Sequence, residues 1–338
     1  MVFERGKFTM VRKRIKEAEG VPNIVVPTIR DNSFFATFLR NWRADFAGCH
    51  LIVIEDRKNK QLNSILKDES TKNGYTYELY DWRDIDKDLG KDSWIISRRT
   101  DTVRDYGYLM AYRNKPLFIA TLDDDLCPAE RGKHIQQFYN ILFTEVEQEA
   151  KYFSTMNNGM LPRGKLTGAK NKVGVAHGAW LNVPDFDAKT QIQETSSFVA
   201  GPTDYYNGIV PKGCFYSMCG MNLAWRPELT KFMYFPLMGA YTGNPIDRCG
   251  DIWAGYYSKY MCDLDDTLHH TGEPYCVHTR ASNPWSNLKK EYREDVLGRE
   301  FIKVLVYDGV PEIEKEYFNK LIDAYDTWER IIDEIDNS

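Results

Sequence analysis

Three short apolar runs, each ending in polar residues, constrain the fold of this chain more than any other feature of its sequence. They are segments 23–30, 50–56 and 116–122. Such runs are typical of strands buried on both faces of a parallel sheet. Between the first two runs, apolar residues recur at helical spacing, namely Phe34, Phe35, Phe38, Leu39 and Trp42. The pattern predicts a βαβ unit in an α/β fold, with a mostly parallel sheet flanked by helices.

The second half of the chain is richer in Gly, Pro, Asn and aromatic residues from about residue 151 onward. No Ser/Pro-rich or charged linker separates it from the first half, so we expect it to continue the same sheet within one domain over residues 1–306. Residues 307–338 form an acidic amphipathic helix whose apolar stripe contains Ile313, Tyr317, Leu321, Ala324, Trp328, Ile331 and Ile335. This helix is expected to pack on the body or on another subunit, which leaves a homo-oligomer open.

Composition excludes several classes of protein. Lys and Arg number 44 against 49 Asp and Glu, a net charge of -5, whereas a nucleic-acid-binding domain carries a basic excess. No apolar run approaches the roughly 20 residues of a membrane span. The seven cysteines form an odd set without a CxxC pair, and no apolar leader follows the first residue, which predicts a reduced, cytoplasmic protein.

The strongest chemical signal is the triplet Asp123, Asp124 and Asp125, directly after the third apolar run. Because side chains alternate along a strand, Asp123 and Asp125 are expected to point to one side and Asp124 to the other. Two carboxylates on one side suit a hard divalent cation, Mn²⁺ or Mg²⁺, that carries a diphosphate. An exposed acidic turn is the alternative interpretation. Ligands of open α/β sheets bind at the carboxyl ends of the strands, which favours the cation site.

Arginines near the predicted strand ends could bind a diphosphate, because the planar guanidinium offers a fork of donors. They are Arg30, Arg98, Arg99, Arg104 and Arg163. Any of the six histidines could add a metal ligand, and spacing alone does not choose among them. The chain contains no GxGxxG motif, so no flavin is expected.

Eight ordered motifs between Asn23 and Tyr292 resemble the reversibly glycosylated polypeptides, the plant UDP-arabinopyranose mutases of glycosyltransferase family 75. They are Pro27–Arg30, Tyr77–Tyr80, Asp84–Gly90, the aspartate triplet, His177–Asp185, Met218–Ala224, Asp251–Gly255 and Ala281–Tyr292. The resemblance implies a GT-A-like fold in which the triplet binds a divalent metal and a sugar nucleotide.

The resemblance also implies roles for individual residues. The metal ligands would be Asp123, Asp125 and His278, and the catalytic residues Asp251, Arg163 and Asp124. In this family the arginine that matches Arg163 is reported to be glycosylated reversibly, although a phosphate-binding role is equally compatible with its chemistry. The residues expected at the nucleotide are Pro27, Thr28, Arg30, Asp56, Arg104, Asp123 and Asp124.

The implied activity is a metal-dependent interconversion of the pyranose and furanose forms of a UDP-sugar, most directly UDP-L-arabinose. Two alternatives stay open: a glycosyltransferase that passes the sugar to a separate acceptor, and a sugar-nucleotide-binding scaffold without turnover. Lys170 replaces a second family arginine, and Gly250 replaces an acid before Asp251. These departures leave the identity of the sugar open.

Overall fold

The computed structural model describes residues 20–56, 62–148, 156, 169–193, 199–239, 242–279, 283–307 and 309–337. The prediction for Arg163 lies outside these residues. Ten described strands form one sheet: β1 Asn23–Thr28, β2 His50–Glu55, β3 Thr76–Tyr80, β4 Ile119–Leu122, β5 Cys127–Pro128, β6 Glu145–Gln148, β7 Ala169–Asn182, β8 Gly208–Ile209, β9 Asn222–Trp225 and β10 Leu268–His278.

The described helices are α1 Asn32–Phe46, α2 Leu62–Asn73, α3 Trp82–Leu89, α4 Arg104–Arg113, α5 His134–Leu142, α6 Ala188–Gln193, α7 Gly250–Leu264, α8 Pro284–Tyr307 and α9 Lys315–Asp336. Short 3₁₀ turns cover 90–95, 101–103, 202–204 and 227–232. None of the described helices is long and apolar enough to cross a membrane.

The sheet has the order β3-β2-β1-β4-β9-β7-β10-β5, with β6 beside β7 and β8 beside β10. Strands β3, β2, β1 and β4 run parallel, as the three apolar runs predict. Strand β9 is antiparallel to both of its neighbours, and β7 and β10 pair in parallel. The α/β class with a large helix-flanked sheet is therefore confirmed, while the second half of the sheet is mixed.

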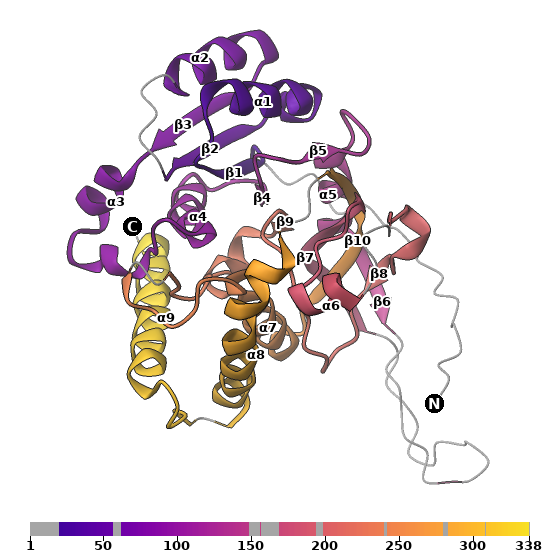
Figure 1. Cartoon of the computed structure of the whole chain (residues 1–338). Coiled ribbons are helices and arrows are strands. Elements are labelled where there is room, and N and C mark those ends of the chain that lie inside the picture. The colour runs from indigo at the N-terminus through magenta and orange to yellow at the C-terminus, as the bar shows by residue number, and fades with distance from the viewer. Residues whose placement is uncertain are drawn as a thin grey trace.

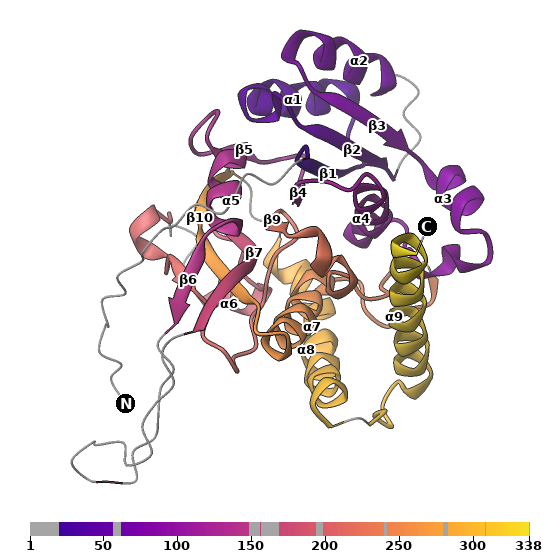
Figure 2. The same ribbon diagram turned by 180° about the vertical axis from the view of Figure 1, so that it is seen from behind.

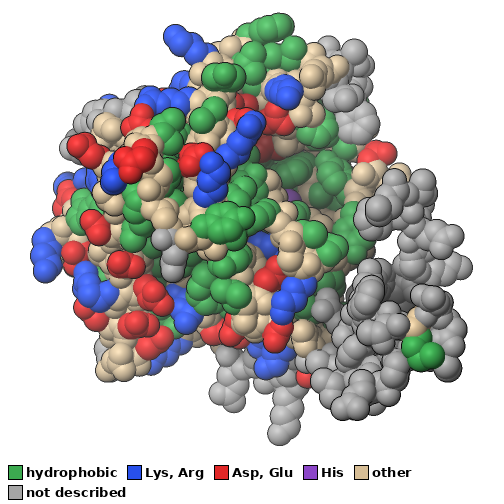
Figure 3. Space-filling model, turned by 90° about the horizontal axis from the view of Figure 1, so that it is seen from below, with side chains coloured by type: hydrophobic (Ala, Val, Ile, Leu, Met, Phe, Trp, Pro, Cys, Tyr) green, Lys and Arg blue, Asp and Glu red, His purple; other side chains and the backbone are tan. Residues whose placement is uncertain are grey.

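Helices cover both faces of the sheet, because buried strands present apolar side chains to both sides (Figure 1). Ile24 and Val26 of β1 point into the core formed with α1, α2 and α5. Val25, between them, points into the opposite core, with α4, α7, α8 and α9. The same two layers are seen from behind in Figure 2. On the face shown in Figure 3, basic and acidic side chains are interspersed rather than gathered into a field of one sign.

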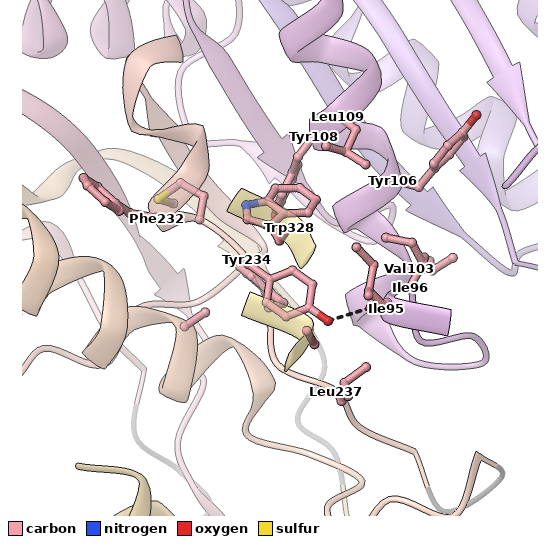
Figure 4. Close-up of a cluster of buried hydrophobic side chains, with 14 of the residues drawn as sticks. Ile95, Ile96, Val103, Tyr106, Tyr108, Leu109, Phe232, Tyr234, Leu237 and Trp328 are labelled. Atoms are coloured by element: carbon pink, nitrogen blue, oxygen red, sulfur yellow. Dashed lines mark hydrogen bonds between the residues drawn. The ribbon is translucent and has the colours of Figure 1, made fainter. Parts of the chain in front are cut away.

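The C-terminal helix α9 packs on the body of the chain through its predicted apolar stripe. Tyr317, Leu321, Ala324, Trp328 and Ile331 are all buried. Trp328 lies against Tyr234, and the Tyr234 hydroxyl donates a hydrogen bond of 2.6 Å to the carbonyl of Ile95 (Figure 4). The body is thus one surface on which this helix docks.

Candidate functional site

The predicted binding residues gather at the carboxyl ends of β1, β2 and β4. Thr28 is the last residue of β1, Asp56 follows β2, and the aspartate triplet follows β4. Because these three neighbouring strands are parallel, their carboxyl ends share one edge of the sheet. Pro27 lies one residue earlier in β1, in register with Ile54.

The aspartate triplet forms a turn rather than a continued strand. Strand β4 ends at Leu122, and the Leu126 amide donates back to the carbonyl of Asp123 at 3.4 Å. Strand alternation therefore does not apply beyond Leu122. Asp124 and Asp125 share Arg30 as a partner, whereas Asp123 pairs with Arg104.

Asp124 is the buried member of the triplet. Its carboxylate accepts hydrogen bonds from the Thr28 hydroxyl at 2.6 Å and from Arg30 Nε at 3.2 Å. Burial raises the pKa of Asp124 to about 6, against the opposing effects of Thr28 and Arg30. Asp124 thus ties the end of β1 to the turn after β4.

Arg104, the first residue of α4, is 2% exposed. It donates to Asp123 Oδ1 at 2.7 Å, to the Asp101 carbonyl at 2.8 Å and to the Thr121 hydroxyl at 3.2 Å. A fourth hydrogen bond goes to the carbonyl of Gly220. With so little of its guanidinium exposed, Arg104 is better placed to orient Asp123 than to contact a phosphate itself.

A second group of carboxylates lies close to Asp123. Asp251 is in the first turn of α7, and burial, followed by the charge of Asp185, raises its pKa to about 6. Burial also raises the pKa of Asp101 to about 6, with the charges of Asp251 and Asp123 acting in the same direction. The Cys219 thiol lies 3.6 Å from Asp185 Oδ2. Four aspartates from four segments of the chain therefore influence one another here.

Sequence reasoning missed Asp101 and Asp185 as members of this group. Asp185 is the last residue of the motif that begins at His177, but nothing in that motif indicates that its carboxylate lies near Asp251. Asp101 lies two residues after Arg99, in a segment without a motif or a regular apolar pattern. Both lie outside the predicted strand ends, and only tertiary packing brings them to Asp251.

His278, the last residue of β10, is nearly buried. Its Nδ1 lies 3.0 Å from the carbonyl of Val183. Burial raises the pKa of Asp185, and the nearby His278 opposes part of this rise. His278 is therefore close to the second carboxylate group.

The described residues fit a divalent cation only if the substrate shares in holding it. Within the part of the chain that the structure describes, no three His, Cys, Asp or Glu side chains are arranged to hold a metal by themselves. The side chains of Asp123 and Asp125 are 31% and 27% exposed, so a cation could reach them. Mg²⁺ in particular is commonly held by one or two carboxylates together with substrate phosphates.

Asp56 lies beside a cluster of cations. It accepts a hydrogen bond of 2.5 Å from the indole of Trp82, and burial raises its pKa. The guanidinium carbons of Arg98 and Arg99 lie 5.9 Å and 5.7 Å from the centre of a Trp82 ring. Two arginines thus lie near the end of β2, and one of them, Arg98, pairs with Asp86 at 2.5 Å.

Comparisons with known proteins identify the family. The model of the family "Reversibly glycosylated polypeptide" matches residues 17–307. A potato protein (Solanum tuberosum), "Probable UDP-arabinopyranose mutase 2", is 34% identical over 93% of this chain and 90% of its own length. "UDP-arabinopyranose mutase 1" of Arabidopsis thaliana is 34% identical over 93% and 92%. The structure of S. aureus TarS 1–349 in complex with UDP is similar with a TM-score of 0.48 at 11% identity, over 90% of this chain and 72% of that one. The chain belongs to the reversibly glycosylated polypeptide family.

Proposed function

We propose that this protein is a mutase that interconverts UDP-L-arabinopyranose and UDP-L-arabinofuranose. Curated relatives named UDP-arabinopyranose mutase, matched over nearly the whole chain, support an isomerase. The structural observation that carries the proposal is that an arginine and a buried carboxylate lie near the same edge of the sheet. Arg30 lies with the triplet at the end of β4, and the carboxylate of Asp251 lies in the group around Asp123.

The nucleotide would bind along the carboxyl ends of β1, β2 and β4. The nucleoside would lie beside Thr28 and Asp56, at the ends of β1 and β2, with Pro27 shaping the end of β1. Arg30 would face the diphosphate, because its guanidinium is partly exposed while it pairs with Asp124 and Asp125. Phosphate binding or glycosylation at Arg163 stays a prediction.

The reaction moves a proton within the sugar and leaves its composition unchanged. The bond between C1 and the diphosphate oxygen breaks, and its electron pair leaves with UDP. The 4-hydroxyl oxygen then bonds to C1 and releases its proton, the bond between C1 and the ring oxygen O5 breaks, and O5 takes up a proton. UDP finally returns to C1 of the furanose.

Asp251 is our candidate for this proton transfer and for stabilising positive charge at C1. A pKa of about 6 lets one carboxylate accept the proton from the 4-hydroxyl and return it to O5 near neutral pH. Its ionised form also favours a cationic carbon through electrostatic attraction. Asp185 and Asp101 extend that negative field.

A divalent cation, Mn²⁺ or Mg²⁺, would stabilise the charge that develops on the departing diphosphate. Asp123 and Asp125 would hold it, with His278 as a further ligand on the side of Asp185. The same proposal places the enzyme in the cytoplasm, with a homo-oligomer left open, and needs no flavin.

The test is incubation of the purified protein with UDP-L-arabinopyranose and Mn²⁺, without any acceptor, followed by chromatography of the nucleotide sugars. We expect a UDP-L-arabinofuranose peak that EDTA suppresses and that excess Mn²⁺ or Mg²⁺ restores. Asp251→Asn should form no furanose but still bind UDP. Sugar transfer that occurs only after an acceptor is added would instead indicate a glycosyltransferase. UDP binding without turnover under any condition would indicate a scaffold.

A further inference from the structure

Helix α8 presents two carboxylates, Glu291 and Glu294, to the segments that carry Asp185 and Asp251. The two glutamates are three residues apart, so they lie on one side of the helix. Neither belongs to the aspartate group at the sheet edge. Their hydrogen bonds are instead made to the backbone and side chains beside that group.

Glu294 holds the turn that leads into α7. Its Oε1 accepts hydrogen bonds from the amides of Asp247 and Arg248, both at 2.8 Å, and its Oε2 lies 3.2 Å from the Cys249 thiol. The Glu294 side chain is almost fully buried, and charge-assisted hydrogen bonds of this kind are stronger than neutral ones. Asp251 follows two residues after this turn.

The turn needs such support because Cys249 has a φ of 63°, in the left-handed region. A residue with a Cβ adopts that conformation at a cost of roughly 1–2 kcal/mol. Among the described contacts, the Cys249 side chain makes no capping hydrogen bond at the start of α7. Glu294 therefore holds residues 247–249, which lead into α7 and set the position of Asp251 in its first turn.

Glu291 connects the same turn to the segment after Asp185. Its Oε1 accepts a hydrogen bond of 3.0 Å from Arg248 Nε, and its Oε2 accepts one of 2.5 Å from the amide of Ala188. Ala188 is the first residue of α6, three positions after Asp185. One carboxylate thus bridges the two segments whose aspartates influence each other.

Helix α8 is itself held firmly against α7. A Cβ at Gly298 would lie 3.0 Å from Trp253 Nε1, so glycine permits the close approach of the two helices. The Phe301 ring stacks on Trp253 with a centroid distance of 5.0 Å. A helix fixed in this way can act as a rigid support for the turn.

We propose that Glu294 is a positioning residue that sets the placement of Asp251 for catalysis, with Glu291 coupling that placement to Asp185. The inference rests on the proposed function for the role of Asp251. It goes beyond that function because it assigns part of the catalytic geometry to a helix that contributes no group to the reaction.

The experiment compares Glu294→Ala, Glu294→Gln and the control Asp295→Ala in the full chain. Asp295 is the next residue of α8, and its exposed side chain pairs only with Arg299 among the described contacts. For each variant, kcat and KM for furanose formation, the Kd for UDP and the amide hydrogen exchange of peptides covering 247–252 are measured. Gln keeps an oxygen acceptor for both amides, whereas Ala removes it.

We expect Glu294→Ala to lower kcat by about 100-fold, the effect of misplacing a reacting group by about 1 Å, with the Kd for UDP unchanged. Exchange at 247–252 should accelerate by about tenfold in this variant. Glu294→Gln should have a kcat and an exchange rate close to those of the wild type, and Asp295→Ala should match the wild type in both. A purely structural role for Glu294 predicts equal losses of kcat and UDP affinity, or a lower melting temperature with wild-type kcat, and either result refutes the proposal.

Failure of the proposed function gives a different result. If the wild type binds UDP but forms no furanose, the mutase assignment fails, and hydrogen exchange alone then decides whether Glu294 holds the turn. Unchanged exchange in Glu294→Ala contradicts the positioning role whatever the activity.

Discussion

Replacement of Arg104 by Met should destabilise the protein far more than replacement of an exposed arginine. Arg104 makes four hydrogen bonds inside the protein, including one to the carboxylate of Asp123. Met fills a similar volume but leaves two backbone carbonyls without this donor and Asp123 without its cation. Leaving a buried acceptor without its donor costs about 1–3 kcal/mol, so the two carbonyls together account for roughly 2–6 kcal/mol, while Asp123, which is 31% exposed, stays solvated. We expect a loss of that size in the free energy of unfolding.

Urea denaturation of the wild type, Arg104→Met, Arg104→Lys and Arg299→Met measures this loss. Arg299 is the matched control, because it pairs with Asp295 on the surface and such pairs contribute about 0–1 kcal/mol. Lys at position 104 keeps the charge with three donors instead of five, so its loss should be intermediate. If Arg104→Met lies within 1 kcal/mol of Arg299→Met, the interpretation of Arg104 as a buried support for Asp123 is wrong.

Three further predictions address the site and the core. Burial and the charge of Asp185 raise the pKa of Asp251 to about 6, so the ionised fraction of Asp251 falls as the pH drops through 6. The kcat/KM for furanose formation should therefore decline below about pH 6. A flat profile down to about pH 5 contradicts this role of Asp251. Arg30→Ala removes the cation that pairs with Asp124 and Asp125. It should weaken UDP binding, measured by calorimetry, about tenfold, roughly the value of one charge-assisted hydrogen bond. An unchanged affinity would exclude contact between Arg30 and the diphosphate. Trp328→Ala should lower the free energy of unfolding by about 3–5 kcal/mol in urea with kcat preserved, and a loss of kcat in the folded variant would show that α9 affects the site.

The parallel half of the sheet was predictable because its signals are local. Each of β1, β2 and β4 is an apolar run that ends in polar residues, and α1 shows its buried face in its spacing. Parallel neighbours bring their carboxyl ends together, so the sequence was sufficient to place Thr28, Asp56 and the triplet at one edge. The apolar stripe of α9 was readable for the same reason.

The mixed half of the sheet was not predictable, because its pairing depends on distant residues. Strand β9 has only four residues and inserts between β4 and β7, which precede it by roughly 100 and 50 positions. Gly178 of β7 shows how close that packing is: a Cβ there would lie 2.1 Å from Asn222 Nδ2 and 2.2 Å from the carbonyl of Pro274. No periodicity in the sequence reports such contacts.

The alternation rule failed at the triplet for a related reason. A strand alternates only while it stays extended, and the hydrogen bond from Leu126 to Asp123 turns the chain immediately after β4. The consequence is chemical as well as geometric. Asp123 is directed to Arg104 and the second carboxylate group, while Asp124 and Asp125 face Arg30.

This division of partners gives the site an electrostatic direction. Along the strand ends that would bind the nucleotide, carboxylates are matched by arginines: Arg30 pairs with Asp124 and Asp125, and Arg98 pairs with Asp86. On the other side, burial and the charges of neighbouring aspartates raise the pKa of Asp101 and of Asp251 to about 6, and the charge of Arg104 offsets only part of this rise. Breaking the bond from C1 to the diphosphate separates negative charge on UDP from positive charge on the sugar. Carboxylates on the sugar side favour that separation, and removing the charge of Asp251 would oppose the same step in both directions of the reaction.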